Sequence, residues 1–233
     1  CKVSRRSPAQ SGSACGSATR GDVDSDRDDE QCCERTAAPQ PTMGSIVAIV
    51  QLIGAILFSI GSACFVWMAF VDDWVLPLRL GCGLWIGGCV PYTFLAVRGE
   101  VLREEKTIAF HVANALQIGG MLGWAIGSAF AFLDDLDFGL QVTNGGFLAG
   151  SCCLFLDPLL QCRKFGGLER DEQISLSADL IAGVFYVLAG GFGGYAVDSM
   201  ELMQFGNVCW LVGSLISGTR PIIALCRPKA STK

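Results

Sequence analysis

Two stretches decide the expected fold: FLAGSCCLFLDPLL at residues 147–160 and WLVGSLISGTRPII at residues 210–223. Both contain a Gly-Ser pair and then a charged residue followed by proline, and Pro158 and Pro221 are 63 residues apart. The same offset relates Gly87, Gly150 and Gly213. A fixed period indicates that one structural unit has been copied. The sequence therefore predicts three tandem units of about 63 residues.

Apolar residues are concentrated within these units. Of 233 residues, 51% are hydrophobic, and the mean hydropathy is +0.45. Each apolar run approaches the ~20 residues that cross a bilayer's hydrocarbon core, and 17% charged residues give too little polar surface for a soluble bundle. We expect an all-α membrane protein with six transmembrane helices in three hairpins. The expected helices are 46–70, 76–97, 108–133, 139–160, 180–197 and 205–226, of which the fourth is the weakest because polar residues dilute its start.

The N-terminal segment has a different composition. Residues 1–42 mix Ser, Gly, Ala and Arg with acidic residues and contain few large apolar side chains. Such a segment cannot bury enough apolar surface to offset the entropy of ordering it, so we expect a disordered tail. The expected hairpin repeats are 43–106, 107–173 and 174–233, the last ending in a short basic tail. Because residue 1 is Cys, we interpret the chain as a fragment or a processed form.

The links between helices differ in charge. The short links 71–74, 134–137 and 198–203 are acidic, with Arg79 the only basic residue near them. The other links and the C-terminal tail carry nine basic residues, which are Arg98, Arg103, Lys106, Arg163, Lys164, Arg170, Arg227, Lys229 and Lys233. Since short basic loops stay on the cytoplasmic side, we expect both termini there, or on the matrix or stromal side of an organelle.

The acidic links have two interpretations. Carboxylates at a helix N-terminus cap free N–H groups and complement the helix dipole, which accounts for them without a function. Alternatively, they form a ring that gathers cations at a pore mouth.

Glycines recur at a spacing that favours close helix packing. Gly54 and Gly61 are seven residues apart, and the equivalent runs repeat this spacing. In lipid, small residues allow neighbouring backbones to approach, here the first helices of adjacent repeats; flexibility or ligand contact is the alternative use. The expected packing glycines are Gly54, Gly61, Gly120, Gly127, Gly150, Gly183, Gly190 and Gly213.

These units resemble the YrhK-like domain family, whose unit is a two-helix membrane hairpin with a Gly-Ser pair midway and a basic residue after the second helix. Gly-Ser pairs begin at Gly61, Gly127, Gly150 and Gly213, and the closest copy is WLVGSLISGTRPIIALCR at residues 210–227. Repeat one departs with Gly-Gly at 87–88, and repeat three with Gly-Gly at 190–191. The resemblance implies three tandem copies of the hairpin and carries no established activity.

Two charges lie well inside the expected helices. Asp157 and Arg220 occupy the same repeat position, and charges within a membrane are costly unless they face a partner or a polar cavity. We hypothesise an intramembrane pair. The alternative is that both lie near the interface, with Arg220 reaching the headgroups. The single histidine, His111, is interpreted as a helix-packing hydrogen bond rather than a metal or proton site.

The twelve cysteines are not expected to form a metal or disulfide framework, since six lie inside apolar runs and no Cys-x-x-Cys spacing occurs. Cys162 and Cys226 lie beside basic residues at the expected membrane boundary, which suggests palmitoylation. We find no catalytic motif and expect no cofactor and no metal.

The expected function is that of a non-enzymatic structural or interaction subunit. Its expected partners are the lipid bilayer and other membrane proteins or a second copy, with no nucleic acid. The alternative is a small-solute or ion transporter or channel that uses Asp157, Arg220 and His111, since parallel repeats occur in transporters.

Overall fold

The computed structural model describes residues 43–68, 70–71, 75–102, 107–131, 139–195 and 199–227. Within these ranges the secondary structure is helical, and no strand occurs. This confirms the expected all-α class. The expected disordered tail, 1–42, and the acidic links 71–74 and 134–137, except for residue 71, lie outside the described residues. Residues 199–203 of the third expected link are described, and a helix begins within that link at Met200 rather than at residue 205.

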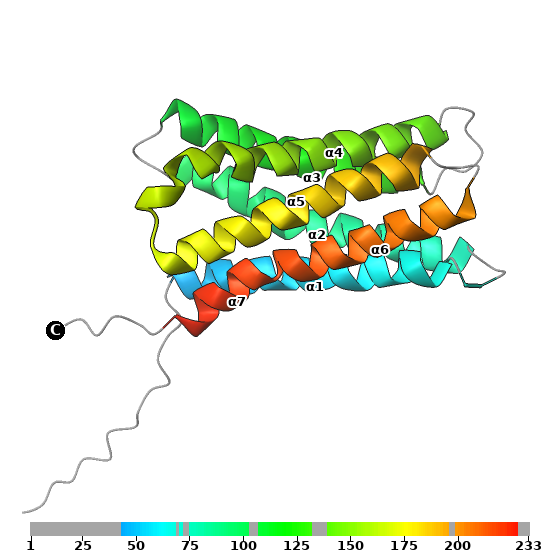
Figure 1. The fold of residues 1–233 in the computed structure, drawn as a ribbon, viewed down its shortest axis with the longest axis horizontal. Helices are drawn as coiled ribbons and strands as arrows, with labels where there is room; N and C mark the ends of the chain where they lie inside the picture. Colours follow the sequence, from blue (N-terminus) through cyan, green and yellow to red (C-terminus); the bar gives the residue numbers. More distant parts are fainter. Residues whose placement is uncertain are drawn as a thin grey trace, which may run out of the picture. The chain divides into compact units, whose positions relative to one another are not determined.

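Six long helices and two short ones make up the described part of the chain (Figure 1). Their bounds are α1 Met43–Met68, α2 Val75–Leu102, α3 Ile108–Phe130, α4 Gly139–Gln161, the 3₁₀ helix η1 Cys162–Gly167, α5 Arg170–Tyr195, α6 Met200–Ser217 and α7 Thr219–Cys226.

The six long helices form a closed ring. Each packs against its neighbours in chain order, and contacts between α6 and α1 complete the circle. The amino ends of α1, α3 and α5 lie at the same end of the bundle as the carboxyl ends of α2 and α4 (Figure 1). We call this the basic end, because the described residues there include Arg98, Arg163, Lys164, Arg170, Arg220 and Arg227.

Five of the helices are long and apolar enough to cross a membrane, as expected of a multi-pass membrane protein. The spans are Gly44–Met68, Val75–Val101, Gln141–Gly167, Arg170–Phe192 and Met200–Cys226. The fourth run, expected to be the weakest, is one of these five. Instead, α3 is the helix left out, although it has 23 residues, because His111, Asn114 and Gln117 lower its hydropathy.

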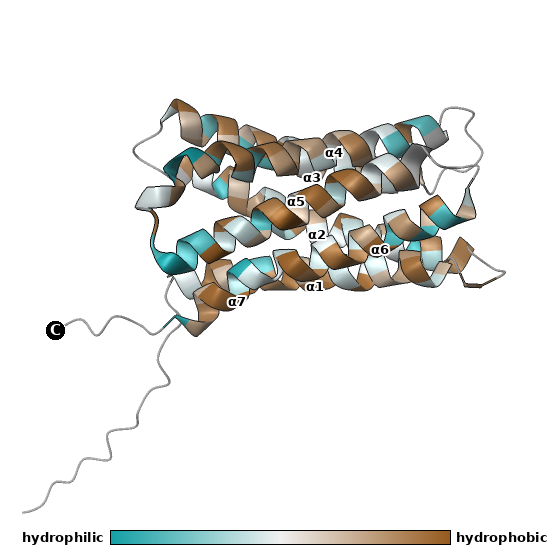
Figure 2. Cartoon of the chain, viewed as in Figure 1, coloured by the Kyte–Doolittle hydropathy of each residue, from teal (hydrophilic) through white to brown (hydrophobic). Residues whose placement is uncertain are grey.

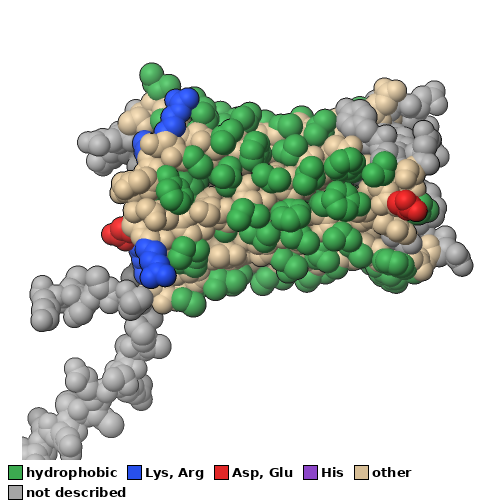
Figure 3. All heavy atoms as spheres, viewed as in Figure 1, with side chains coloured by type: hydrophobic (Ala, Val, Ile, Leu, Met, Phe, Trp, Pro, Cys, Tyr) green, Lys and Arg blue, Asp and Glu red, His purple; other side chains and the backbone are tan. Residues whose placement is uncertain are grey.

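Apolar side chains also cover the outside of the bundle. Figure 2 shows apolar residues along the helix middles and hydrophilic ones near the ends. The face in Figure 3 carries a broad apolar belt, with Lys and Arg gathered at one end. Large side chains such as Ile53, Val90 and Leu215 are about half exposed or more. An apolar belt between charged ends is the surface that a bilayer requires.

The fifth and sixth expected helices differ most from their expected boundaries. The fifth helix begins at Arg170 rather than at residue 180, so the boundary expected at residue 174 falls inside it. Its polar first turns are helical because Asp171 and Glu172 complement the N-terminal dipole. The sixth expected helix is divided into α6 and α7 at Gly218. Pro221 has no N–H to donate to the carbonyl four residues earlier, which breaks the hydrogen-bond ladder there.

Candidate functional site

Aromatic rings fill the centre of the ring of helices. Each long helix contributes at least one ring; taking one from each gives six, and all of these but the half-buried Phe147 are buried. The rings are Phe58, Trp85, Trp124, Phe147, Tyr186 and Trp210, which we call the aromatic layer. The ring centroids of Trp85 and Trp210 are 4.5 Å apart, and those of Trp85 and Trp124 are 4.8 Å apart. Such close tilted and edge-to-face contacts leave the middle of the bundle filled by side chains.

The residues of the aromatic layer are regularly spaced in the sequence, but the search for motifs did not detect this spacing. Phe58, Trp124 and Tyr186 are 66 and 62 residues apart, while Trp85, Phe147 and Trp210 are 62 and 63 residues apart. These spacings are close to the 63-residue period. The aromatic type differs among these positions, so the spacing appears only when Phe, Trp and Tyr are grouped.

Serine hydroxyls of the Gly-Ser pairs accept hydrogen bonds from the indole N–H groups of two of these rings. Trp85 donates its indole N–H to Ser62 Oγ at 3.3 Å, and Trp124 donates to Ser151 Oγ at 3.2 Å. The Oγ atoms of Ser62 and Ser214 are 3.0 Å apart, which links α1 to α6. Asn207 of α6 also donates to the Phe65 carbonyl of α1 at 2.9 Å. Two buried hydrogen bonds therefore join the first and last long helices.

One serine lacks such a partner. Ser128 is fully buried, and within the described part of the chain its Oγ makes no hydrogen bond. It follows Gly127 as Ser62 follows Gly61. Where α6 carries Ser214, the offset of 63 places Ser151 on α4 and Gly88 on α2. Because glycine has no hydroxyl, α2 offers no equivalent partner at that position.

The expected packing glycines all face a neighbouring helix. A Cβ atom on Gly150 or Gly213 would lie 2.5 or 2.8 Å from the ring of Trp124 or Tyr186, and Gly61 faces Trp85 in the same way. Backbone approach is closest around α3 and α4, where a Cβ on Gly127 would lie 2.9 Å from the Thr143 carbonyl oxygen. The other neighbours are Tyr92 for Gly54, Leu154 for Gly120, Phe155 for Gly183 and Leu148 for Gly190.

These contacts correct the expected partners of the glycines. Gly120 and Gly127 of α3 pack against α4, which is the next helix along the chain, and Gly183 and Gly190 of α5 pack against α4. The first helices of adjacent units were expected to meet at these glycines. In a closed ring each helix instead lies between its two chain neighbours, so every first helix faces second helices.

The charged residues at the basic end pair differently from the hypothesis. Arg220 donates from Nη1 to Asp179 Oδ2 at 2.8 Å, and this carboxylate belongs to α5. Asp157 accepts a hydrogen bond from Gln161 Nε2 at 2.8 Å, one turn along α4. Arg220 interacts with Asp157 electrostatically but not at hydrogen-bond distance. Sequence reasoning missed Asp179 because the expected fifth helix began one residue after it.

His111 takes part in a contact between α2 and α3. Its Nδ1 lies 2.6 Å from Glu100 Oε1, and Asn114 Nδ2 donates to Glu100 Oε2 at 2.8 Å. One carboxylate thus joins the first two turns of α3 to the end of α2. This agrees with the interpretation of His111 as a helix-packing residue.

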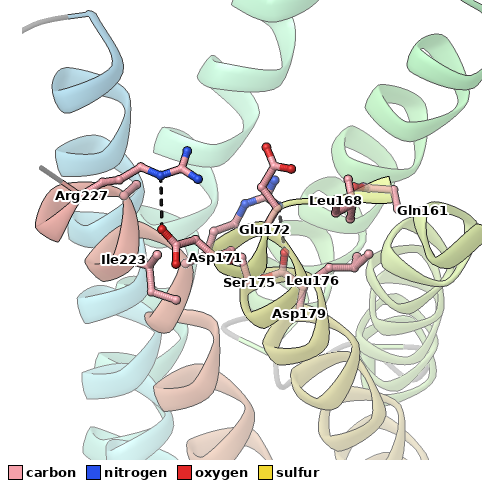
Figure 4. A pocket seen from close by; sticks show the side chains of 11 residues that line it. Gln161, Leu168, Asp171, Glu172, Ser175, Leu176, Asp179, Ile223 and Arg227 are labelled. Atoms are coloured by element: carbon pink, nitrogen blue, oxygen red, sulfur yellow. Dashed lines mark hydrogen bonds and ion pairs between the residues drawn. The ribbon is translucent and has the colours of Figure 1, made fainter. Parts of the chain in front are cut away.

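A cavity of about 280 Å³ opens among α5, α7 and the end of α4. Figure 4 shows Arg227, which follows α7, and Asp171 of α5 facing one another, with Arg227 Nε donating to Asp171 Oδ2 at 3.2 Å. Arg227 Nη2 also donates to Glu169 Oε2 at 2.6 Å. The lining residues are Gln161, Leu168, Asp171, Glu172, Ser175, Leu176, Asp179, Arg220, Ile223, Ala224 and Arg227.

The cysteines and potential metal ligands are dispersed. Cys162 is half buried in η1, Cys226 is exposed at the end of α7, and both are free thiols at the basic end. Among the described residues, no group of three or more His, Cys, Asp or Glu side chains could hold a metal ion.

Comparisons with known proteins gave no relative. No protein-family model matches the chain, and neither a curated protein nor a solved structure does. Functional inference therefore depends on the geometry described above.

Proposed function

We propose that this chain is an integral membrane protein that crosses the bilayer six times and acts as a non-catalytic structural or interaction subunit. The aromatic layer is the observation that carries this proposal. Six rings from six helices occupy the position that a central conduction path would need. A bundle closed in this way suits a role in assembly within the membrane better than a role in transport through its centre.

The proposal includes α3 as the sixth span. A helix of 23 residues is about 34 Å long, which exceeds the roughly 30 Å of a hydrocarbon core. Two of its polar residues, His111 and Asn114, lie in its first two turns and contact Glu100 of α2. Its remaining length packs between α2 and α4 within the ring, so these polar side chains have protein partners near the basic end.

We further propose that the six helices are three copies of a YrhK-like hairpin. Similar contacts recur in each consecutive pair, where a glycine of the second helix faces a ring of the first: Gly88 faces Phe58, Gly150 faces Trp124, and Gly213 faces Tyr186. The near-63-residue spacing of the aromatic layer supports the same interpretation. The excess of Lys and Arg at the basic end favours placing that end on the cytoplasmic, matrix or stromal side.

Proteoliposomes test the central part of this proposal. We expect proton and potassium gradients to be dissipated no faster in vesicles that contain the purified chain than in protein-free vesicles. Native electrophoresis in mild detergent should show a particle larger than one chain with its micelle, because a subunit associates. Gradient release in proportion to the amount of protein, with migration as a single chain, would contradict it.

A small-solute or ion transporter is the second candidate, and the cavity at the basic end is the observation that favours it. Asp179 and Arg220 line this cavity, with Asp157 close by, and intramembrane charges commonly mark transport pathways. If flux is found, Asp157→Asn is the discriminating variant. A flux that this substitution abolishes supports the transporter, whereas an unchanged flux removes Asp157 from the pathway.

A further inference from the structure

The cavity at the basic end has the depth of a lipid headgroup and the first part of its chains. Its lining extends from Asp171 to Asp179, about 12 Å along α5. The headgroup layer of one leaflet is roughly 5–8 Å deep. Lining residues that span about 12 Å from the first turn of α5 therefore reach from the headgroup level into the hydrocarbon.

Its charges are mixed, with a slight acidic excess. Three carboxylates, those of Asp171, Glu172 and Asp179, face two guanidinium groups, those of Arg220 and Arg227. An anionic lipid would add negative charge to this lining, and a bare cation would meet two arginines. A ligand that carries both a positive and a negative group complements it best.

Two lining side chains retain hydrogen-bonding capacity. Arg220 has five N–H groups, and one of them binds Asp179. Its side chain is 51% exposed, so the remaining donors can reach a phosphate. Glu172 accepts one hydrogen bond, from the Glu169 backbone N–H at 3.2 Å, and has no ion-pair partner within the described ranges. Its carboxylate can accept from an ammonium group.

The apolar residues of the lining, and its lack of aromatic residues, restrict the chemical class of the ligand further. Leu168, Leu176 and Ile223 provide an apolar wall suited to glycerol and acyl carbons. No lining residue is aromatic, whereas quaternary ammonium groups are typically bound in aromatic cages. An ammonium group with N–H donors fits carboxylates better than a trimethylammonium group does.

From these observations we propose that the cavity binds a zwitterionic phospholipid of the ethanolamine class, with its phosphate at Arg220 and its ammonium group at Glu172. This inference concerns a lipid ligand and does not rest on the proposed role as a subunit.

Native mass spectrometry of the delipidated full-length chain tests the proposal. Phosphatidylethanolamine, phosphatidylcholine and phosphatidylglycerol with identical acyl chains are titrated in turn. We expect the ethanolamine lipid to bind about tenfold more tightly than the other two, the effect of one charge-assisted hydrogen bond. Equal binding of the three lipids, or a preference for the anionic one, would overturn the proposal.

Glu172→Gln is the matched variant, because Glu172 is exposed and its loss leaves the ion pairs of Arg220 and Arg227 intact. We expect it to reduce the preference for ethanolamine over choline by about tenfold. The control is Glu201→Gln, an exposed residue in the first turn of α6 at the opposite end, which should leave the preference unchanged. Unchanged lipid preference in Glu172→Gln would contradict the assignment of the ammonium group.

A competition experiment with a water-soluble headgroup distinguishes binding of a lipid from binding of the free headgroup. Glycerophosphoethanolamine has the same charged groups without acyl chains. At millimolar concentration we expect it not to displace the bound lipid, because it cannot use the apolar wall. Displacement at concentrations equal to those of the lipid would overturn the lipid assignment in favour of a soluble metabolite.

Discussion

The middle of the bundle and its basic end differ in the types of residue that they contain. The middle consists of aromatic rings, glycines and serines, without a charged side chain in its core cluster, whereas the basic end holds the ion pairs and the cavity. In the middle, affinity between helices comes from packing and a few hydrogen bonds. At the basic end, contact with water and headgroups lowers the free-energy cost of desolvating charged side chains. The difference separates residues that hold the ring together from residues that can bind a ligand.

The largest expected effect is the loss of a ring from the aromatic layer. Trp85→Ala should destabilise the protein by about 3–5 kcal/mol, since it removes a fully buried side chain and its bond to Ser62. Trp67→Ala is the control, because Trp67 is 47% exposed. Thermal unfolding in detergent compares them. Similar melting temperatures for the two variants would show that the layer does not hold the middle together.

A smaller loss is expected where two backbones approach. Gly127→Leu should cost about 1–3 kcal/mol, because its Cβ meets the Thr143 carbonyl of α4 and backbone cannot move aside. Gly83→Leu provides the matched control, since nothing lies within 4 Å of a Cβ at that position. The melting temperature in detergent is again the measurement. Equal tolerance at both positions would remove close approach as the role of Gly127.

Two serines in equivalent positions should respond differently. Ser62→Ala removes an acceptor from Trp85 and a partner from Ser214, and should cost about 1–2 kcal/mol. Ser128→Ala removes a buried hydroxyl that has no partner in the described structure, and should be neutral or stabilising. Chemical denaturation of both variants measures the difference. A loss at Ser128 as large as that at Ser62 would indicate an unseen partner for Ser128.

At the basic end the expected effect is smallest. A double-mutant cycle that exchanges Asp179 and Arg220 should give a coupling energy of about 0.5–1 kcal/mol, because Arg220 is half exposed. The same cycle on Asp157 and Arg220 should give less, since they are not in hydrogen-bond contact. Stronger coupling to Asp157 would restore the pair expected from the sequence.

The sequence predicted the parts of the fold that depend on hydropathy. Long apolar runs are sufficient to place a membrane helix, and five candidate spans follow the expected order. The boundaries of α5 were wrong because Asp171 and Glu172 are polar, yet they favour a helix N-terminus. Hydropathy alone ends a helix where the apolar residues end, although the backbone continues beyond them.

The candidate sites were harder to predict. Arg220 binds Asp179 rather than Asp157, and Asp179 was overlooked because hydropathy placed it before the fifth helix, in a polar stretch that the structure makes helical. The aromatic layer was missed for a different reason. Its six rings are visible as spaced aromatics, but their convergence requires the closed arrangement of α1 to α6.

The closed ring is the central claim, and cross-linking between α1 and α6 tests it most directly. In a chain whose native cysteines are replaced, Ser62→Cys with Ser214→Cys places two thiols where the hydroxyl oxygens are 3.0 Å apart. The chain is cleaved in the link at residues 103–106 after mild oxidation. A closed ring predicts that the two fragments remain joined on a non-reducing gel and separate on reduction, whereas Gly83→Cys with Ser214→Cys does not join them. Failure of the 62–214 pair to cross-link in folded protein would contradict the closed ring.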